Sequence, residues 1–167
     1  MAAQVYVAAG SNVEPELNLT RALTELARIF GALHVSPWYR NHAVGFDGED
    51  FINLVLGFTT ELSVYQMQAR LRDVETLCGR PRNAPKWAPR TMDLDILLYG
   101  DVVKDEPQLR LPRPDLLLRP YMLKPLTDIA PTLRHPTDGR TVAQLWAGFD
   151  PAAHEMIAVR PAAMVGG

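Results

Sequence analysis

Two aspartates separated by one residue, Asp93 and Asp95, form the clearest chemical signal in the sequence. They lie in the apolar run Thr-Met-Asp-Leu-Asp-Ile-Leu-Leu-Tyr at 91–99, which is typical of a strand. Alternate strand residues point to the same face, so we expect both carboxylates to stand side by side. The other face is then expected to enter the core through Met92, Leu94, Ile96 and Leu98. Paired carboxylates suit Mg²⁺, which adds water and phosphate oxygens, but an isolated Asp-x-Asp is more often a solvated strand face.

A basic loop directly precedes the acidic pair. Residues 80–90 contain three prolines and no acid, which predicts a long loop without regular structure. Its basic residues are Arg80, Arg82, Lys86 and Arg90. Guanidinium groups beside a carboxylate pair offer a polyphosphate fork-shaped donors and positive charge. Trp87 adds a flat face for a base or a lid contact, and a solvated loop that binds nothing is the alternative.

The elements that must position these residues are predicted from short apolar runs and helical spacing. Strands are expected at 4–9, 33–40, 51–60 and 91–99. Gly10-Ser11-Asn12 is expected to turn the chain, with Asn12 capping a helix that begins near residue 14 and ends at Gly31. A second helix is predicted between Ser63 and Gly79. A mobile loop is expected at 41–50, and a hairpin-like stretch, a loop at 112–115 and a short helix over 121–129 are expected beyond the fourth strand.

The order strand–helix–strand–strand–helix–strand predicts an α+β fold. We expect a ferredoxin-like antiparallel sheet with helices packed on it, plus mobile active-site loops. A single domain is expected over residues 1–150, followed by an Ala/Pro/Gly-rich tail over 151–167 that frays. Because this fold hosts many functions, the function must be argued from the site.

Composition excludes several classes of protein. The net charge of −2 provides no global positive field for nucleic acid or an anionic membrane, and no segment approaches the ~20 apolar residues of a membrane helix. The aromatic run of an RNA-recognition sheet is also missing. Cys78 is the only cysteine, so no intrachain disulfide can form, and we expect a cytoplasmic protein. The four histidines show no metal-ligand spacing.

The stretch Lys-Trp-Ala-Pro-Arg-Thr-Met-Asp-Leu-Asp-Ile at 86–96 resembles the signature of the 6-hydroxymethyl-7,8-dihydropterin pyrophosphokinases. Ala88 and Met92 stand where that signature has glycine and leucine. Further matches in order and spacing are Ala-Gly-Ser-Asn at 9–12, Phe-Ile-Asn at 51–53, Glu75 with the Gly-Arg-Pro-Arg of 79–82, and Tyr-Met-Leu-Lys-Pro-Leu at 121–126. The resemblance covers residues 4–147.

This resemblance implies a monomeric enzyme that transfers pyrophosphate from ATP to the hydroxymethyl group of a reduced pterin and releases AMP, a step of folate synthesis. It implies two Mg²⁺ ions held by Asp93 and Asp95. Asp95, Arg80 and Arg90 are the implied catalytic residues: the carboxylate helps to deprotonate the hydroxyl, and the arginines bind the transferring phosphates.

The resemblance also implies binding residues for both substrates. Further ATP contacts are expected from Glu75, Arg82, Trp87, Ile96, Arg113 and Arg119. Asn53 is expected to read the polar edge of the pterin, with Phe51 and Tyr121 stacking on its ring. The loop that frames the pterin is expected to contribute Asn41, Ala43, Val44 and Gly45.

Two departures from the family pattern concern this site. Residues 41–45 read Asn-His-Ala-Val-Gly where the family usually has Thr-Pro-Pro-Leu-Gly, and Arg113 takes the place of a histidine. Two alternatives therefore stay open: a divergent paralogue that acts on a modified pterin, and a catalytically inactive ATP-binding regulator.

Overall fold

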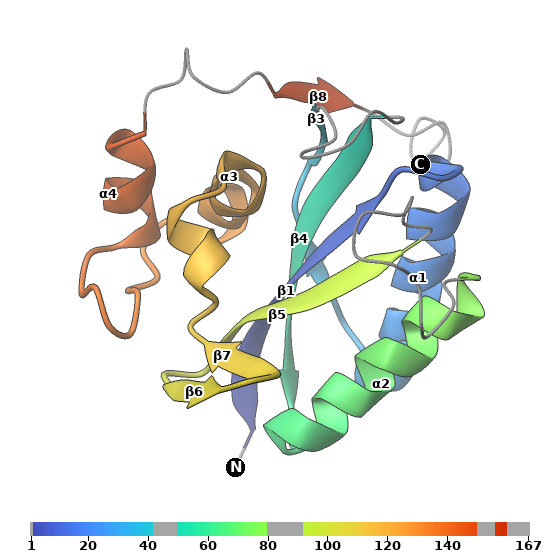
Figure 1. The fold of residues 1–167 in the computed structure, drawn as a ribbon, viewed down its shortest axis with the longest axis horizontal. Coiled ribbons are helices and arrows are strands. Elements are labelled where there is room, and N and C mark those ends of the chain that lie inside the picture. Colours follow the sequence, from blue (N-terminus) through green and yellow to red (C-terminus); the bar gives the residue numbers. More distant parts are fainter. Residues whose placement is uncertain (1, 42–49, 80–91, 150–155, 160–167) are drawn as a thin grey trace.

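A six-stranded antiparallel sheet forms the centre of the fold (Figure 1). The computed structural model describes residues 2–41, 50–79, 92–149 and 156–159. The strands follow the order β5-β1-β4-β3-β8, and β2 also pairs with β4. Their bounds are β1 Ala3–Ser11, β2 His34–Val35, β3 Trp38–Asn41, β4 Phe51–Thr60, β5 Asp93–Tyr99 and β8 Ile157–Val159. The predicted α+β fold with an antiparallel sheet is confirmed.

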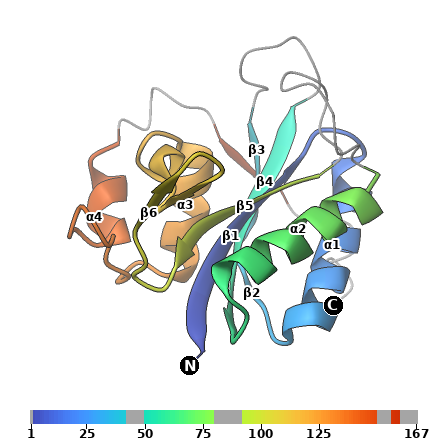
Figure 2. The same cartoon turned by 60° about the horizontal axis from the view of Figure 1, so that its bottom comes forward.

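Helices cover both faces of this sheet (Figures 1 and 2). One face packs against α1 (Pro15–Phe30) and α2 (Val64–Leu77), and the other against α3 (Pro120–Ile129) and α4 (Val142–Ala147). A small hairpin of β6 (Lys104–Glu106) and β7 (Leu109–Leu111) and the 3₁₀ turn η1 (Pro114–Leu117) connect β5 to α3. None of the helices in the described ranges is long and apolar enough to cross a membrane.

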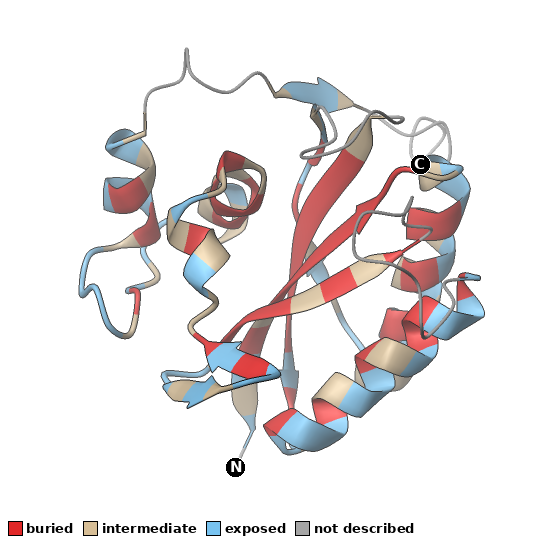
Figure 3. Ribbon diagram, in the orientation of Figure 1, coloured by how far each residue is buried: buried red, intermediate tan, exposed pale blue. Residues whose placement is uncertain are grey.

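Two apolar cores follow from this arrangement, and Figure 3 shows buried residues along the central strands and the helix faces turned toward them. Alternation along β1 sends Val5 and Val7 to the core under α1 and α2, while Ala8 joins the core under α3 and α4. β4 is buried along nearly all of its length because both of its faces are covered.

A β-bulge in β5 changes which face its later residues occupy. The pairing of β1 with β5 shifts between Tyr6 and Val7, so that Tyr6 lies opposite Leu98 and Val7 opposite Ile96. Leu94 and Ile96 therefore pack under α1 and α2 as predicted, whereas Leu98 packs in the other core with α3 and α4. The prediction that Leu98 shares a face with Ile96 was wrong, because the extra residue of a bulge reverses the alternation.

The helix boundaries follow local signals, with one exception. Ser63 caps α2 through a capping box with Gln66, as its position predicted. The prediction that Asn12 caps α1 was wrong: Glu14, in a left-handed conformation with φ of 40°, occupies the N-cap without a side-chain hydrogen bond. β1 continues through Ser11, so the chain turns later than predicted.

Four other segments differ from expectation. The predicted strand 33–40 is divided into β2 and β3, because Ser36 lies between them and exchanges hydrogen bonds with Val55. Helix α4 and the turn η1 were not predicted. Within the tail expected to fray, Ile157–Val159 pairs with β3 as strand β8, since the edge of β3 offers free backbone groups to a passing segment.

Candidate active site

A cavity of about 260 Å³ lies between the sheet and the segment that runs from η1 into α3. Polar and aromatic side chains from separate elements meet there. The strands contribute Ala8, Ala9, Gly10, Asn41, Phe51, Asn53, Asp93 and Asp95, and the segment beyond β7 contributes Arg113, Asp115, Arg119, Tyr121 and Met122. The cavity therefore contains a charged part and a part formed by amides and aromatic rings.

The two aspartates of β5 form the acidic part of the cavity. Asp93 is paired with Gly10 and Asp95 with Ala8, so both residues are held in register with β1. Burial and then the nearby Asp93 carboxylate raise the pKa of Asp95 to about 7, although the guanidinium groups of Arg113 and Arg72 oppose the rise. Burial and the proximity of Asp93 therefore disfavour the charged form of Asp95 in the protein alone, and a cation bound beside the pair would favour it.

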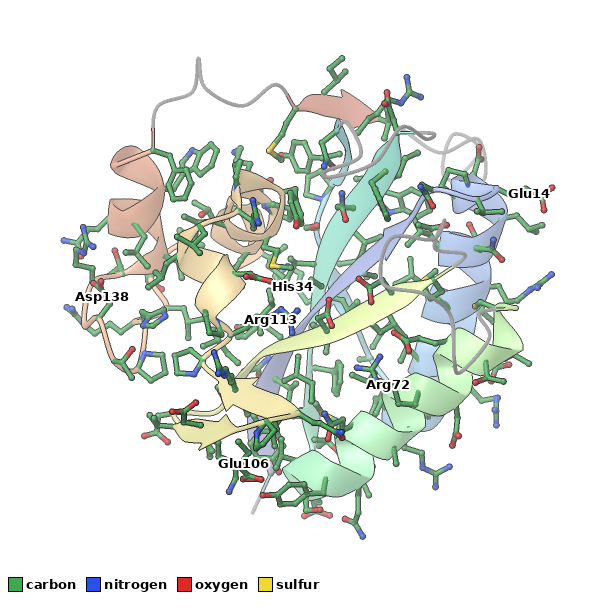
Figure 4. The ribbon with its side chains drawn as sticks, viewed as in Figure 1. Glu14, His34, Arg72, Glu106, Arg113 and Asp138 are labelled. Carbon is green, nitrogen blue, oxygen red and sulfur yellow. The ribbon has the colours of Figure 1, made fainter. Side chains whose placement is uncertain are left out.

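Arg113, labelled in Figure 4, contacts two carboxylates of this part of the cavity. Its Nη1 is 3.5 Å from Asp95 Oδ1, and its Nη2 is 3.5 Å from Asp115 Oδ2. Arg113 Nε is buried without a hydrogen-bond partner among the described residues. Asp115 was not predicted as a site residue; the signal for it in the sequence is its place beside Pro114 and two residues after Arg113.

The opposite part of the cavity is formed by amide and aromatic side chains. Asn53 Nδ2 donates a hydrogen bond to Asn41 Oδ1, and the two residues come from the paired strands β4 and β3. Phe51 lies on β4, and Tyr121 lies in the first turn of α3, where burial raises the pKa of its hydroxyl. Together these groups offer amide donors and acceptors and apolar ring faces, which suits a flat polar heterocycle.

Gly10 allows these two parts of the cavity to adjoin. It is paired with Asp93 on one side and with Asn53 on the other, so it lies between the acidic pair and the amides. A Cβ atom at this position would overlap Asn53 Oδ1. Gly10 was predicted to form a turn, and this role was not predicted from the sequence.

Two residues expected to contact ATP do not line the cavity. Ile96 is 6% exposed and packs in the core under α1 and α2. Glu75 is 4% exposed and accepts a 2.7 Å hydrogen bond from the Leu94 backbone N–H. The other predicted site residues in the basic loop and the pterin-framing loop lie outside the described residues: Arg80, Arg82, Trp87, Arg90, Ala43, Val44 and Gly45.

The donor set of the cavity fits Mg²⁺ in the presence of a polyphosphate. Within the described ranges, no group of three or more His, Cys, Asp or Glu side chains gathers as a complete metal cage. Mg²⁺ does not need such a cage, because it commonly binds one or two carboxylates and completes its shell with water and substrate phosphates. Asp93 and Asp95 provide two carboxylates in one cavity with nearby arginines. The fold and the site thus define an α+β enzyme of the phosphoryl-transfer class.

Comparison with known proteins identifies the family. Residues 6–131 match the family described as 7,8-dihydro-6-hydroxymethylpterin-pyrophosphokinase (HPPK), and the chain belongs to this family. The 2-amino-4-hydroxy-6-hydroxymethyldihydropteridine pyrophosphokinase of Synechocystis sp. is 39% identical over 142 residues, which are 83% of this chain and 72% of that protein. The enzyme of the same name from Pseudomonas aeruginosa is 39% identical over 151 residues, 88% of this chain and 92% of that protein.

Solved structures show the same fold. Plasmodium falciparum HPPK-DHPS with pteroate superimposes with a TM-score of 0.70 at 12% identity, over 88% of this chain and 42% of that chain. The same protein with pterin and p-hydroxybenzoate gives a TM-score of 0.71 at 15% identity, over 88% and 43% of the two chains. This chain therefore spans about two fifths of those longer proteins, and the likeness concerns the fold alone.

Proposed function

We propose that this protein transfers pyrophosphate from ATP to the hydroxymethyl group of 6-hydroxymethyl-7,8-dihydropterin and releases AMP. The observation that carries the proposal is the cavity in which the Asp93–Asp95 pair adjoins the Asn41–Asn53 amides. The membership of the HPPK family and the names of the relatives support the same reaction.

The amide and aromatic part of the cavity is proposed to bind the pterin. The Asn53 and Asn41 side chains can match donors and acceptors on the edge of the ring, and their mutual hydrogen bond orients both amides before binding. Phe51 and Tyr121 supply ring faces from the sheet and from α3. With the ring held there, the hydroxymethyl group is proposed to lie on the side of Asp95, because the amides adjoin the acidic pair across Gly10.

The acidic part is proposed to hold two Mg²⁺ ions through Asp93 and Asp95. When bound, Mg²⁺ neutralises phosphate charge and lowers the pKa of a coordinated hydroxyl. Asp95 is the group we assign to accept the proton of the hydroxyl, because its carboxylate is only 15% exposed and lines the cavity beside Asp93. A new bond forms between the hydroxyl oxygen and the β-phosphorus, and the bond from that phosphorus to the bridging oxygen of the α-phosphate breaks.

Arginines are proposed to stabilise the phosphates during transfer. Arg113 and Arg119 line the cavity beside the acidic pair, and Arg113 is within 3.5 Å of Asp95. Arg80 and Arg90 are proposed as the catalytic arginines, with Arg82 and Trp87 as further ATP contacts and Ala43, Val44 and Gly45 as pterin contacts. Reactions of this type depend on positioning and charge neutralisation more than on covalent chemistry.

An AMP-release assay with Asp95→Asn tests the proposal. AMP should form only when ATP, Mg²⁺ and 6-hydroxymethyl-7,8-dihydropterin are all present, and Asp95→Asn should reduce turnover by at least about 100-fold, as expected for loss of a general base and metal ligand. Asp105→Asn is the matched control, because the Asp105 side chain is 88% exposed on the β6–β7 hairpin and lies outside the cavity.

The same assay separates the open alternatives. If folded wild-type protein binds Mg·ATP but forms AMP only with a modified pterin, the chain is a divergent paralogue. If it binds Mg·ATP and turns over no pterin, it is a regulator. A folded Asp95→Asn protein with wild-type turnover would refute the metal assignment.

A further inference from the structure

Two side chains of α2 hold the backbone of β5 between its two aspartates. Glu75 Oε2 accepts a 2.7 Å hydrogen bond from Leu94 N–H, and Arg72 Nη2 donates a 3.1 Å hydrogen bond to the Leu94 carbonyl. Arg72 Nη1 also lies 2.5 Å from Glu75 Oε1, so the two side chains form an ion pair. Figure 4 shows Arg72 between α2 and β5.

This contact takes the place of a neighbouring strand. β5 is the last strand in the order of the sheet, with β1 on one side only. In an antiparallel pair, alternate residues direct both backbone groups toward the partner strand, and the residues between them direct both groups away. Leu94 is of the second kind, because both its N–H and its C=O are bound by α2. Without Arg72 and Glu75, this buried peptide would lack hydrogen bonds, at a cost in free energy.

The location of the contact connects it with the proposed metal site. Leu94 lies directly between Asp93 and Asp95, which are paired with Gly10 and Ala8 of β1. The backbone that carries the two carboxylates is therefore fixed by β1 at the aspartates and by α2 at the residue between them. Glu75 is almost fully buried, whereas the Arg72 side chain is 38% exposed. A partly exposed arginine can be replaced without opening a large hole in the core.

We propose that Arg72 and Glu75 are positioning residues for the Asp93–Asp95 pair, which set the spacing of the carboxylates and thereby the affinity for Mg²⁺. This inference rests on the proposed role of the pair in binding Mg²⁺ and assigns a purpose to two residues that do not line the cavity. Arg72 orients the Glu75 carboxylate, Glu75 and Arg72 hold the Leu94 peptide, and the peptide orients the flanking aspartates.

Arg72→Met tests this chain of contacts, with Arg70→Met as the matched control. Both variants remove one positive charge from α2, but Arg70 is exposed, and only Arg72 contacts β5. Mg²⁺ binding is measured by calorimetry on the protein saturated with a non-hydrolysable ATP analogue. Amide hydrogen exchange of Leu94 is measured by NMR on the protein without nucleotide.

In Arg72→Met, Mg²⁺ affinity should fall by about tenfold, the lower end for residues that support metal ligands indirectly. Exchange of the Leu94 amide should accelerate by about tenfold, because Glu75 loses the partner that orients it. The KM for the pterin should stay within about twofold of wild type, because Arg72 does not line the cavity that is proposed to bind the pterin. Arg72→Lys, which keeps one donor for the carbonyl or the carboxylate, should recover part of both losses.

Three results would overturn the inference. One is Mg²⁺ affinity in Arg72→Met equal to that of Arg70→Met. Another is weaker binding of the ATP analogue without Mg²⁺ and unchanged exchange at Leu94, which would make Arg72 a direct nucleotide contact. The third is a wild-type protein that binds no Mg²⁺ in the presence of the analogue, which would refute the metal assignment itself and so is distinguishable from the first two.

Discussion

The close approach of β1 to the Asn53 side chain makes Gly10→Ala a sharp test of the cavity. A Cβ at position 10 would overlap Asn53 Oδ1, whereas the next nearest atoms, Asn53 Cγ and Ile52 O, lie 3.5 and 3.8 Å away, which is ordinary contact. Gly10 is not among the glycines with positive φ, so alanine fits the backbone. Only the end of the Asn53 side chain has to move.

The expected loss of activity in Gly10→Ala follows from the displacement of the Asn53 amide. The Asn53 amide must retreat by on the order of 1 Å, and a displacement of this size can cost about 100-fold when it misplaces a positioning group. Its hydrogen bond to Asn41 is disturbed as well, a contact worth about 1 kcal/mol. We expect kcat/KM for the pterin to fall by roughly 10- to 100-fold, or about 1.4–2.7 kcal/mol. Stability should change little, because replacing glycine in a compatible conformation gains about 0.4–1 kcal/mol and offsets part of the strain.

The assay varies the pterin and ATP separately and records thermal unfolding of each variant. The KM for ATP should stay close to wild type, because the displaced amide belongs to the other part of the cavity. Gly57→Ala is the matched control: it lies on β4 away from the cavity, and its Cβ would meet Tyr6 Cε1 at 2.8 Å. It should perturb the sheet without changing pterin kinetics.

A double variant tests whether the effect of Gly10→Ala acts through the Asn53 side chain. In Gly10→Ala with Asn53→Ala, the overlap no longer exists, so pterin binding should be no weaker than in Asn53→Ala alone. Additive losses in the double variant, or wild-type pterin kinetics in Gly10→Ala, would show that the Asn53 amide is not what Gly10 accommodates.

Two further predictions concern stability. In the metal-free protein, the raised pKa of Asp95 means that the folded state keeps a proton that the unfolded state releases, so Asp95 lowers the free energy of unfolding as the pH rises from 3.8 to about 7. Denaturant unfolding across this range should show that Asp95→Asn gains stability over wild type with rising pH, and a constant difference would contradict the prediction. Tyr39→Phe removes the hydroxyl that donates to the Asp128 carboxylate and connects β3 to α3, which should cost about 1.5 kcal/mol and lower Tm by about 3–6 °C. Tyr65→Phe is the control: this exposed tyrosine donates a hydrogen bond to Glu106, and its loss should lower Tm much less. Equal decreases in Tm for the two variants would contradict the prediction.

The sequence by itself determined the main strands and helices and the acidic, phosphate-binding character of the site. The continuous apolar run at 51–60 predicted β4 at its observed bounds, and Ser63 predicted the start of α2, because such signals act between residues close in the chain. The Asp-x-Asp run and the neighbouring matches were sufficient for the family, since these residue types follow one another directly in the sequence.

Only the tertiary structure decided which distant residues meet. It placed Gly10 between Asn53 and Asp93, reversed the face of Leu98 through a bulge, and brought Arg72 and Glu75 of α2 onto the Leu94 peptide. It also paired residues 157–159 with β3, which no local signal predicted. Strand register, bulges and contacts between a helix and a strand edge form between segments that are far apart in the sequence. Their free energy therefore depends on both segments together, and neither segment predicts the contact by itself.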